Sequence, residues 1–442
     1  MSRIRKALAS PWCWVWLGVW TLVAAVVSFR DTELTKCYLK AAQRFVGGAD
    51  IYARTSDGVG IWPYPPAMIL TVAPLAWLPE WAARILWSGA LTGCMVVAAW
   101  GLTRTALAGM AEGRARSHRV LALVLTGLAA HQIVLSPVIY QSHDPILAAG
   151  IGLALVAALK HHDAIAGALL GAIGAMKVTP GLFGLAFALS GRWRALGVMA
   201  LVAAALTILP DAMRGDTDGA LTRRFTAVAQ SASDPARAGG GYWAEWNPLA
   251  QNLSATLTRL TIPTPSGSRD INQRDWSLMH LSDAQRRGLV LLGQAAVVAA
   301  VVTVVGAVRW RRASHPAPLE MLVETGAICC GMLLLAPHSS NYHFAIEAFA
   351  IAPCIILAIE RRDPLMITVA CVLGLLGLPS GRDLIGNFAV DALLIWGKLT
   401  LGTCVALAGC VRAAILLRRD YALAFAREER LAVGDAAGAT PP

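Results

Sequence analysis

Residues 10–40 read SPWCWVWLGVWTLVAAVVSFRDTELTKCYLK, a long apolar run that ends abruptly on charged residues. As a helix, the run over residues 11–28 is long enough to cross the ~30 Å hydrocarbon core of a bilayer. No small-residue cleavage site leads into a soluble domain, so we expect an uncleaved first span rather than a signal peptide. Asp31 and Glu33 then lie at a membrane surface.

Apolar runs of this kind recur along nearly the whole chain. Hydrophobic residues make up 56% and charged residues 15% of the 442 residues, and the mean hydropathy is +0.57. A soluble domain carries roughly 25% charged residues. The composition therefore excludes a soluble protein and predicts one all-α, polytopic membrane domain over residues 1–418. Residues 419–442 are expected to form a cytoplasmic tail that is disordered at its end.

The formal net charge of +11 does not indicate nucleic-acid binding, because of where the basic residues lie. They form clusters that each cap an apolar run, as the positive-inside rule requires of cytoplasmic loops. The clusters are SRIRK, RTALAGMAEGRARSHR, KHHD, GRWR, RWRRASH, ERRD and LLRRD. This distribution predicts a multi-pass protein of the cell membrane whose loops 30–66 and 210–288 are extracytoplasmic.

About 12 spans satisfy this topology. They cover residues 11–28, 82–103, 120–136, 145–159, 164–176, 178–190, 195–209, 289–308, 319–336, 343–359, 364–379 and 389–416. The run AMILTVAPLAWLP is too short to cross, so we expect it to be re-entrant or interfacial. Residues 164–190 form two short halves that meet at MKVTP, and a hairpin there would lift Lys177 to the outer surface or just beneath it.

Titratable side chains gather at the outer ends of the predicted spans rather than at mid-membrane. A transporter would bind its cargo near mid-membrane, so this placement favours an enzyme. A transporter or flippase for a polyprenyl-linked or polysaccharide substrate is the alternative, with Glu324 and Glu347 as its in-span acids, and a scaffold is a third. The outer acid–base set comprises Asp31, Glu33, His143, Asp144, Lys177, His338 and His343.

Six segments occur in the order seen in glycosyltransferase family 87. They are RDTELTKCYLKAAQRFVGGADIY, WPYPPAMILTVAPLAWLP, YQSHDPILAAGIGLALVAALK, GALLGAIGAMKVTPGLFGLAFALSGRWRA, NPLAQNLSATLTRL and LLLAPHSSNYHFAIEAFAIAP. Over roughly residues 12–360 the chain thus resembles that family, which belongs to the GT-C superfamily and includes polyprenyl-phosphate-mannose-dependent mannosyltransferases. The resemblance implies a GT-C fold with extracytoplasmic juxtamembrane helices.

The resemblance also implies a reaction. An inverting transferase would move a hexose, which this likeness implies is mannose, from a polyprenyl-phosphate donor to a glycolipid or glycan acceptor, using an acid just after the first span as base. Counting back from CYLKAA places the usual acid near Leu34, so Asp31, or else Glu33, must be shifted onto that position. No cofactor or metal is implied, and Asp216 and Asp218 in GDTDG are interpreted as a polar turn.

The expected site residues follow from the same segments. His343 matches the family's histidine and joins Asp31 and Glu33 as a catalytic candidate. Gln141 resembles the family's glutamine, whereas the following polar residue, often Asn in the family, is His143 here. The expected substrate-binding residues are Tyr64, Gln141, His143, Asp144, Lys177, Asn252, Arg259 and His338.

Overall fold

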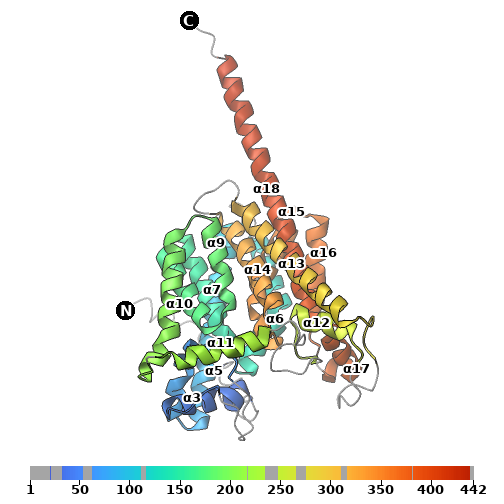
Figure 1. The fold of residues 1–442 in the computed structure, drawn as a ribbon. Coiled ribbons are helices and arrows are strands. Elements are labelled where there is room, and N and C mark those ends of the chain that lie inside the picture. Colours follow the sequence, from blue (N-terminus) through green and yellow to red (C-terminus); the bar gives the residue numbers. More distant parts are fainter. Residues whose placement is uncertain are drawn as a thin grey trace.

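The computed structural model describes residues 20, 32–52, 62–110, 116–216, 218–233, 247–264, 275–309, 316–380 and 382–438. These residues form helices joined by turns, and none of them lies in a strand (Figure 1). Apart from Trp20, the predicted first span falls outside the described residues, and so does Asp31. The predicted all-α, polytopic membrane fold is confirmed for the part of the chain that is described.

Seven of the described helical segments are long and apolar enough to cross a membrane. They are α5 (Glu80–Gly109), α6 (Arg116–Ile139), α10 (Trp193–Met213), α13 (Asp283–Arg309), α14 (Pro318–Leu335), η6 (Asn341–Glu347) continued by α15 (Ala348–Arg361), and α18 (Lys398–Gly438). Four shorter apolar segments coincide with other predicted spans: α7 (Asp144–Leu159), α8 (Asp163–Met176), η4 (Thr179–Leu182) with α9 (Phe183–Leu189), and α16 (Pro364–Leu376).

The last predicted span, 389–416, is wrong in its first part. Helix α17 (Arg382–Ile395) ends before a turn at Trp396 and Gly397, and α18 begins only at Lys398. Gly397 has φ +74°, a backbone conformation that glycine adopts without steric cost. The unbroken apolar sequence hides this turn, because hydropathy does not distinguish a membrane helix from an apolar helix that lies beside it.

The turns between helices gather at two ends of the bundle. At one end, from which α18 projects (Figure 1), Arg412 of α18 donates to Asp363 in the α15–α16 turn at 2.6 Å. Arg192, just before α10, pairs with Asp163, the first residue of α8. These turns are among those predicted to be cytoplasmic, so the described ion pairs agree with the predicted grouping.

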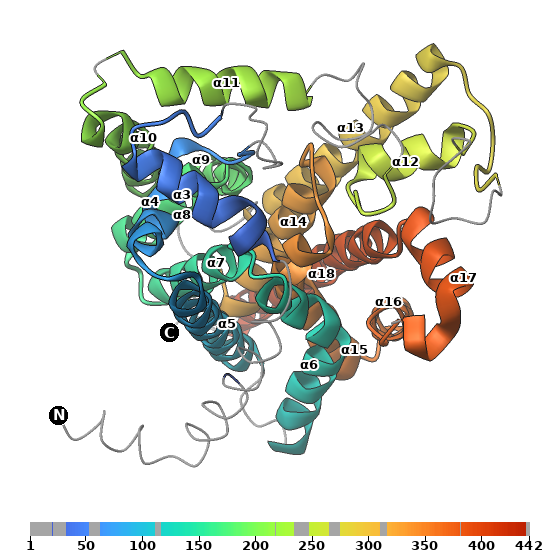
Figure 2. The ribbon, with the colours of Figure 1, turned by 90° about the horizontal axis from the view of Figure 1, so that it is seen from below.

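Short helices lie across the other end of the bundle (Figure 2). They include η1 (Leu34–Tyr38), α3 (Leu39–Val46), α11 (Ala220–Ser233), α12 (Leu253–Thr261) and α17. Residues 66–77, predicted not to cross the membrane, break into η2 (Pro66–Met68), α4 (Ile69–Val72) and η3 (Ala73–Trp77). This end of the bundle holds the candidate site.

Helix α8 packs tightly against α10 through two glycines spaced four residues apart. A Cβ atom built on Gly167 or Gly171 would overlap the carbonyl oxygen of Ala195 or Met199. Small residues at this spacing allow the backbones of membrane helices to approach closely. The contact holds the helix whose carboxyl end leads into Lys177.

Candidate functional site

An ion pair lies at the centre of the site. Lys177 follows the last residue of α8, and its Nζ donates to Oδ1 of Asp144 at 2.9 Å. Asp144 is the first residue of α7, and Ser142 Oγ donates to its other oxygen at 3.1 Å. The Asp144 side chain is only 1% exposed and that of Lys177 is 17% exposed. At this end of the bundle, Lys177 therefore pairs with the buried carboxylate of Asp144.

His343 approaches this pair from η6. The backbone N–H of Ser340 donates to His343 Nδ1 at 2.9 Å, so the neutral ring carries its proton on Nε2. That Nε2 lies 3.7 Å from Asp144 Oδ2 and has no hydrogen-bond partner among the described residues. The ring of His338 lies 5.9 Å away, centroid to centroid. His343 thus presents one N–H donor next to the ion pair.

His143 lies among aromatic side chains on the other side of the ion pair. The Tyr38 hydroxyl is 3.0 Å from His143 Nδ1, and the Tyr64 ring packs edge-on against the imidazole at 4.5 Å. Burial lowers the pKa of His143 to about 4, so the ring is neutral at physiological pH. Burial, with the nearby charge of Lys177, also lowers the pKa of His338 to about 4.

Glu33 lines a cavity at this end of the bundle. Its Oε1 accepts a hydrogen bond from the Tyr342 hydroxyl at 3.3 Å, and the Tyr342 ring packs against His343 with centroids 4.6 Å apart. Burial raises the pKa of Glu33, and the Tyr342 hydrogen bond and Lys36 lower it by less. The cavity encloses about 640 Å³, part of it open to solvent.

A π-helical turn follows Glu33 directly. Residues Leu34–Tyr38 form η1, which continues into α3. A π turn holds one residue more than an α-helical turn, so a count made in α-helical register is displaced by one on its amino-terminal side. Leu34, the position reached by counting in the sequence, is fully buried, whereas the adjacent Glu33 lines the cavity.

Gln141 supports the site rather than facing it. Its Oε1 accepts from Thr32 Oγ1 at 2.6 Å, and its Nε2 donates to Ser88 Oγ at 2.8 Å. The backbone N–H of Glu33 donates to the neighbouring carbonyl of Tyr140 at 3.1 Å. These bonds tie the segment after the first predicted span to α5 and to the α6–α7 turn. They also hold Gln141 at φ +54°, a strained value for a residue other than glycine.

Arg259 and Asn252 are not brought into contact with the ion pair. The buried Arg259 guanidinium donates to the backbone oxygens of Asn247, Ala250 and Ile395, so a phosphate would have to displace these bonds. Asn252 Nδ2 donates to the carbonyls of residues 336 and 337, at 2.9 and 2.7 Å. Arg259 and Asn252 were predicted to bind substrate, and the bonds observed here give both a structural role, in which α12 positions the loop that carries His338 and His343.

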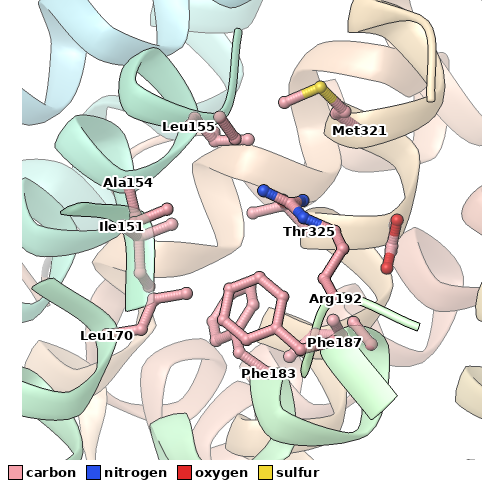
Figure 3. Close-up of a pocket in the computed structure, with 14 residues that line it drawn as sticks. Ile151, Ala154, Leu155, Leu170, Phe183, Phe187, Arg192, Met321 and Thr325 are labelled. Atoms are coloured by element: carbon pink, nitrogen blue, oxygen red, sulfur yellow. The ribbon is translucent and has the colours of Figure 1, made fainter. Parts of the chain in front are cut away.

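A second, smaller cavity, of about 50 Å³, lies between α7, α8, α9 and α14 (Figure 3). The Arg192 guanidinium projects into it among side chains such as Ile151, Leu155, Phe183 and Met321 (Figure 3). Its lining on α7 begins seven residues beyond Asp144, about 10 Å along the helix axis. This cavity therefore lies toward the opposite end of the bundle from the acid–base cluster.

Comparison with models of protein families matches residues 62–337 to glycosyltransferase family 87, more than half of the 442 residues. The chain belongs to glycosyltransferase family 87. Placement in the GT-C superfamily fits that family. Comparison with curated proteins finds no match. Family 87 membership decides between the alternatives that the sequence left open, because it makes the protein a glycosyltransferase rather than a transporter or scaffold.

Two tyrosines of this family 87 protein were missed by the sequence reasoning. Tyr342 hydrogen-bonds to Glu33, and Tyr38 contacts His143. Tyr342 precedes His343 directly, so a signal was present in NYH, but an aromatic residue near a span end is more often an interfacial anchor. Tyr38 lies five residues after Glu33, and the sequence does not show that the turn between them is π-helical.

Proposed function

We propose that the protein is an inverting hexosyltransferase that uses a polyprenyl-phosphate sugar on the extracytoplasmic face of the cell membrane. The observation that carries the proposal is the gathering of Glu33, Asp144, Lys177 and His343 at the end of the bundle opposite the basic turns. A lipid carrier holds its phosphate and its reacting sugar carbon at headgroup level, so acid–base groups are needed there.

Glu33 is the preferred base in this proposal. Its carboxylate opens onto a cavity, whereas that of Asp144 is already bonded to Lys177 and Ser142. The extra residue of the π-helical turn also favours Glu33 over Leu34 as the counterpart of the acid that the family likeness implies, where relatives have an α-helical turn. Asp31, outside the described residues, is the alternative.

The transfer would occur in one displacement. Glu33 takes the proton of an acceptor hydroxyl, and the acceptor oxygen attacks the anomeric carbon while the bond from that carbon to the phosphate oxygen breaks. Polyprenyl phosphate leaves with the bonding electrons. Lys177 Nζ and the N–H of His343 stabilise its growing negative charge. A single displacement inverts the anomeric centre, and the likeness to mannosyltransferases favours mannose as the hexose.

The direct test supplies a radiolabelled polyprenyl-phosphate hexose and lipid extracts to the purified full-length protein in nanodiscs. Label should appear in a new glycolipid or glycan. General-base assistance is worth roughly 10²–10⁴-fold, so Glu33→Gln should lower kcat by that factor with little change in donor KM. Asp31→Asn should have a mild effect. The reverse pattern would assign the base to Asp31, and no transfer from any polyprenyl-phosphate hexose would refute the proposed donor.

The proposed orientation has its own test. A single cysteine placed at Ser117, in the basic first turn of α6, should react with an impermeant thiol reagent only after the cells are opened, because basic segments at span ends stay cytoplasmic. Labelling at Ser117 in sealed cells would invert the topology and place the site on the cytoplasmic face.

A further inference from the structure

The cavity beside Glu33 has a lining that differs from that of a phosphate-binding pocket. Apart from Glu33, the one charged side chain in its lining is Lys36, which is exposed to solvent. The other lining residues are neutral: Thr32, Tyr140, Leu249, Ser340, Asn341 and Tyr342. A partly buried carboxylate repels an anion placed against it, so the inner part of this cavity suits an uncharged group.

Two tyrosine rings form one wall of the cavity. The centroids of Tyr140 and Tyr342 lie 5.8 Å apart, and their planes are tilted by 44°. The Tyr140 side chain is 46% exposed, so its ring is accessible from the cavity mouth. Tyrosine offers an apolar ring face with a polar edge. A sugar ring has the complementary form, with C–H groups on its faces and hydroxyls around its edge.

Asn341 adds an unsatisfied polar atom between these rings and the histidine. Its side-chain oxygen Oδ1 is buried and has no hydrogen-bond partner among the described residues. Buried polar atoms in folded proteins are nearly always paired, so this acceptor requires a donor that the described part of the chain does not supply. A hydroxyl group on a ligand would supply it once the Asn341 side chain turns toward the cavity that this residue lines.

From these three features we infer that the cavity is the acceptor subsite and that the acceptor presents an uncharged sugar ring, not a simple lipid alcohol. The ring would stack against Tyr140 and Tyr342, give one hydroxyl to Asn341 and direct another at Glu33. Tyr140 and Asn341 would then determine acceptor specificity. The inference rests on the proposed function for the role of Glu33, but binding of the ring does not depend on the donor.

The test measures acceptor binding without any donor. Full-length protein in nanodiscs is titrated with hexyl glucoside, hexyl mannoside and hexyl galactoside, and with hexyl glycerol as a probe of similar chain length without a ring. Tyr140→Leu removes the aromatic ring, and Tyr140→Phe keeps it. Asn341→Ala removes the unsatisfied oxygen. Neither substitution at Tyr140 removes its backbone carbonyl, which accepts the hydrogen bond from the Glu33 N–H.

We expect at least one hexyl hexoside to bind at least tenfold more tightly than hexyl glycerol. Tyr140→Leu and Asn341→Ala should each weaken that binding by about 3- to 10-fold, the range of one stacking contact or hydrogen bond, and Tyr140→Phe should restore it. Equal affinity for the ringed and ringless probes, or hexoside binding that ignores Tyr140→Leu and Asn341→Ala, would overturn the inference. Hexoside binding sensitive to both substitutions, in a protein that uses no polyprenyl-phosphate donor, would refute only the proposed donor.

Discussion

Removing both partners of the Asp144–Lys177 pair should destabilise the protein by less than the sum of the two single removals. At 2.9 Å and an effective dielectric constant of about 20, the charges attract by roughly 6 kcal/mol before desolvation is subtracted. Breaking a buried pair from one side typically costs about 3–5 kcal/mol. Lys177→Met leaves an Asp144 carboxylate that is 1% exposed, so its effect should fall near the upper limit.

Asp144→Asn should lie near the lower limit, about 3 kcal/mol. The remaining lysine is 17% exposed and can reach water, and asparagine retains an oxygen for Ser142. The double variant, with no unpaired charge, should be less destabilised than the sum of the single variants by at least about 2 kcal/mol. The free energy of unfolding is measured by denaturant titration in mixed micelles for all four proteins.

The double variant also separates folding from function. It should fold, yet its donor KM should rise roughly 10- to 150-fold, because a charge-assisted hydrogen bond to the donor phosphate is worth about 1.5–3 kcal/mol. Additive single-variant energies would show that the pair does not stabilise the fold. A parental donor KM in the folded double variant would remove Lys177 from the phosphate site.

Three further predictions test the surroundings of this pair. Burial raises the pKa of Glu33, so activity should fall on acidification at a higher pH than it would with an ordinary glutamate as base. Tyr342→Phe deletes a hydrogen bond that lowers this pKa, so the acidic limb of the kcat/KM profile should move to still higher pH. An acidic limb that does not move would exclude Glu33 as the base. Arg259→Met should lower the free energy of unfolding by about 3 kcal/mol, because several buried carbonyls lose the guanidinium that hydrogen-bonds to them. The KM for the sugar donor should be unaltered in the folded fraction. A raised KM for the sugar donor would instead indicate that Arg259 binds the donor phosphate. Gly171→Ala should lower the free energy of unfolding by roughly 2 kcal/mol, because its Cβ would overlap the backbone of Met199. Gly174→Ala should not, because there is open space at its Cβ. Equal effects of the two substitutions would show that α8 does not depend on its close packing against α10.

The candidate site was predicted from the sequence in part. Asp144, Lys177, His143, His338, His343, Tyr64 and Glu33 were all expected at one end of the bundle, and the structure groups them there. Polar groups at span ends can be located from hydropathy alone. Their pairing cannot, since Asp144 and Lys177 belong to different helices and the sequence does not state how those helices face each other.

Arg259 and Gln141 have roles that differ from those predicted, because their partners come from distant parts of the chain. Arg259, in NPLAQNLSATLTRL, could bind a phosphate or a set of carbonyls equally well in sequence terms. The fold decides, because α12 packs beside α17 and brings the carbonyls of Leu394 and Ile395 to the guanidinium. Gln141 likewise became a support because Thr32 and Ser88, distant in the chain, meet at its amide.

The sequence by itself determined the all-α membrane fold, because this depends on local composition and helix length. The grouping of the basic turns on one side and the failure of residues 67–79 to cross stay predictions from the same local features. Only the tertiary structure decided the break at Gly397, the partner of Lys177 and the acid that faces the cavity. A turn inside an apolar run leaves hydropathy unchanged, and the π-helical turn that follows Glu33 forms where the chain packs against the α6–α7 turn. Such features arise from contacts between distant segments, which no local pattern contains.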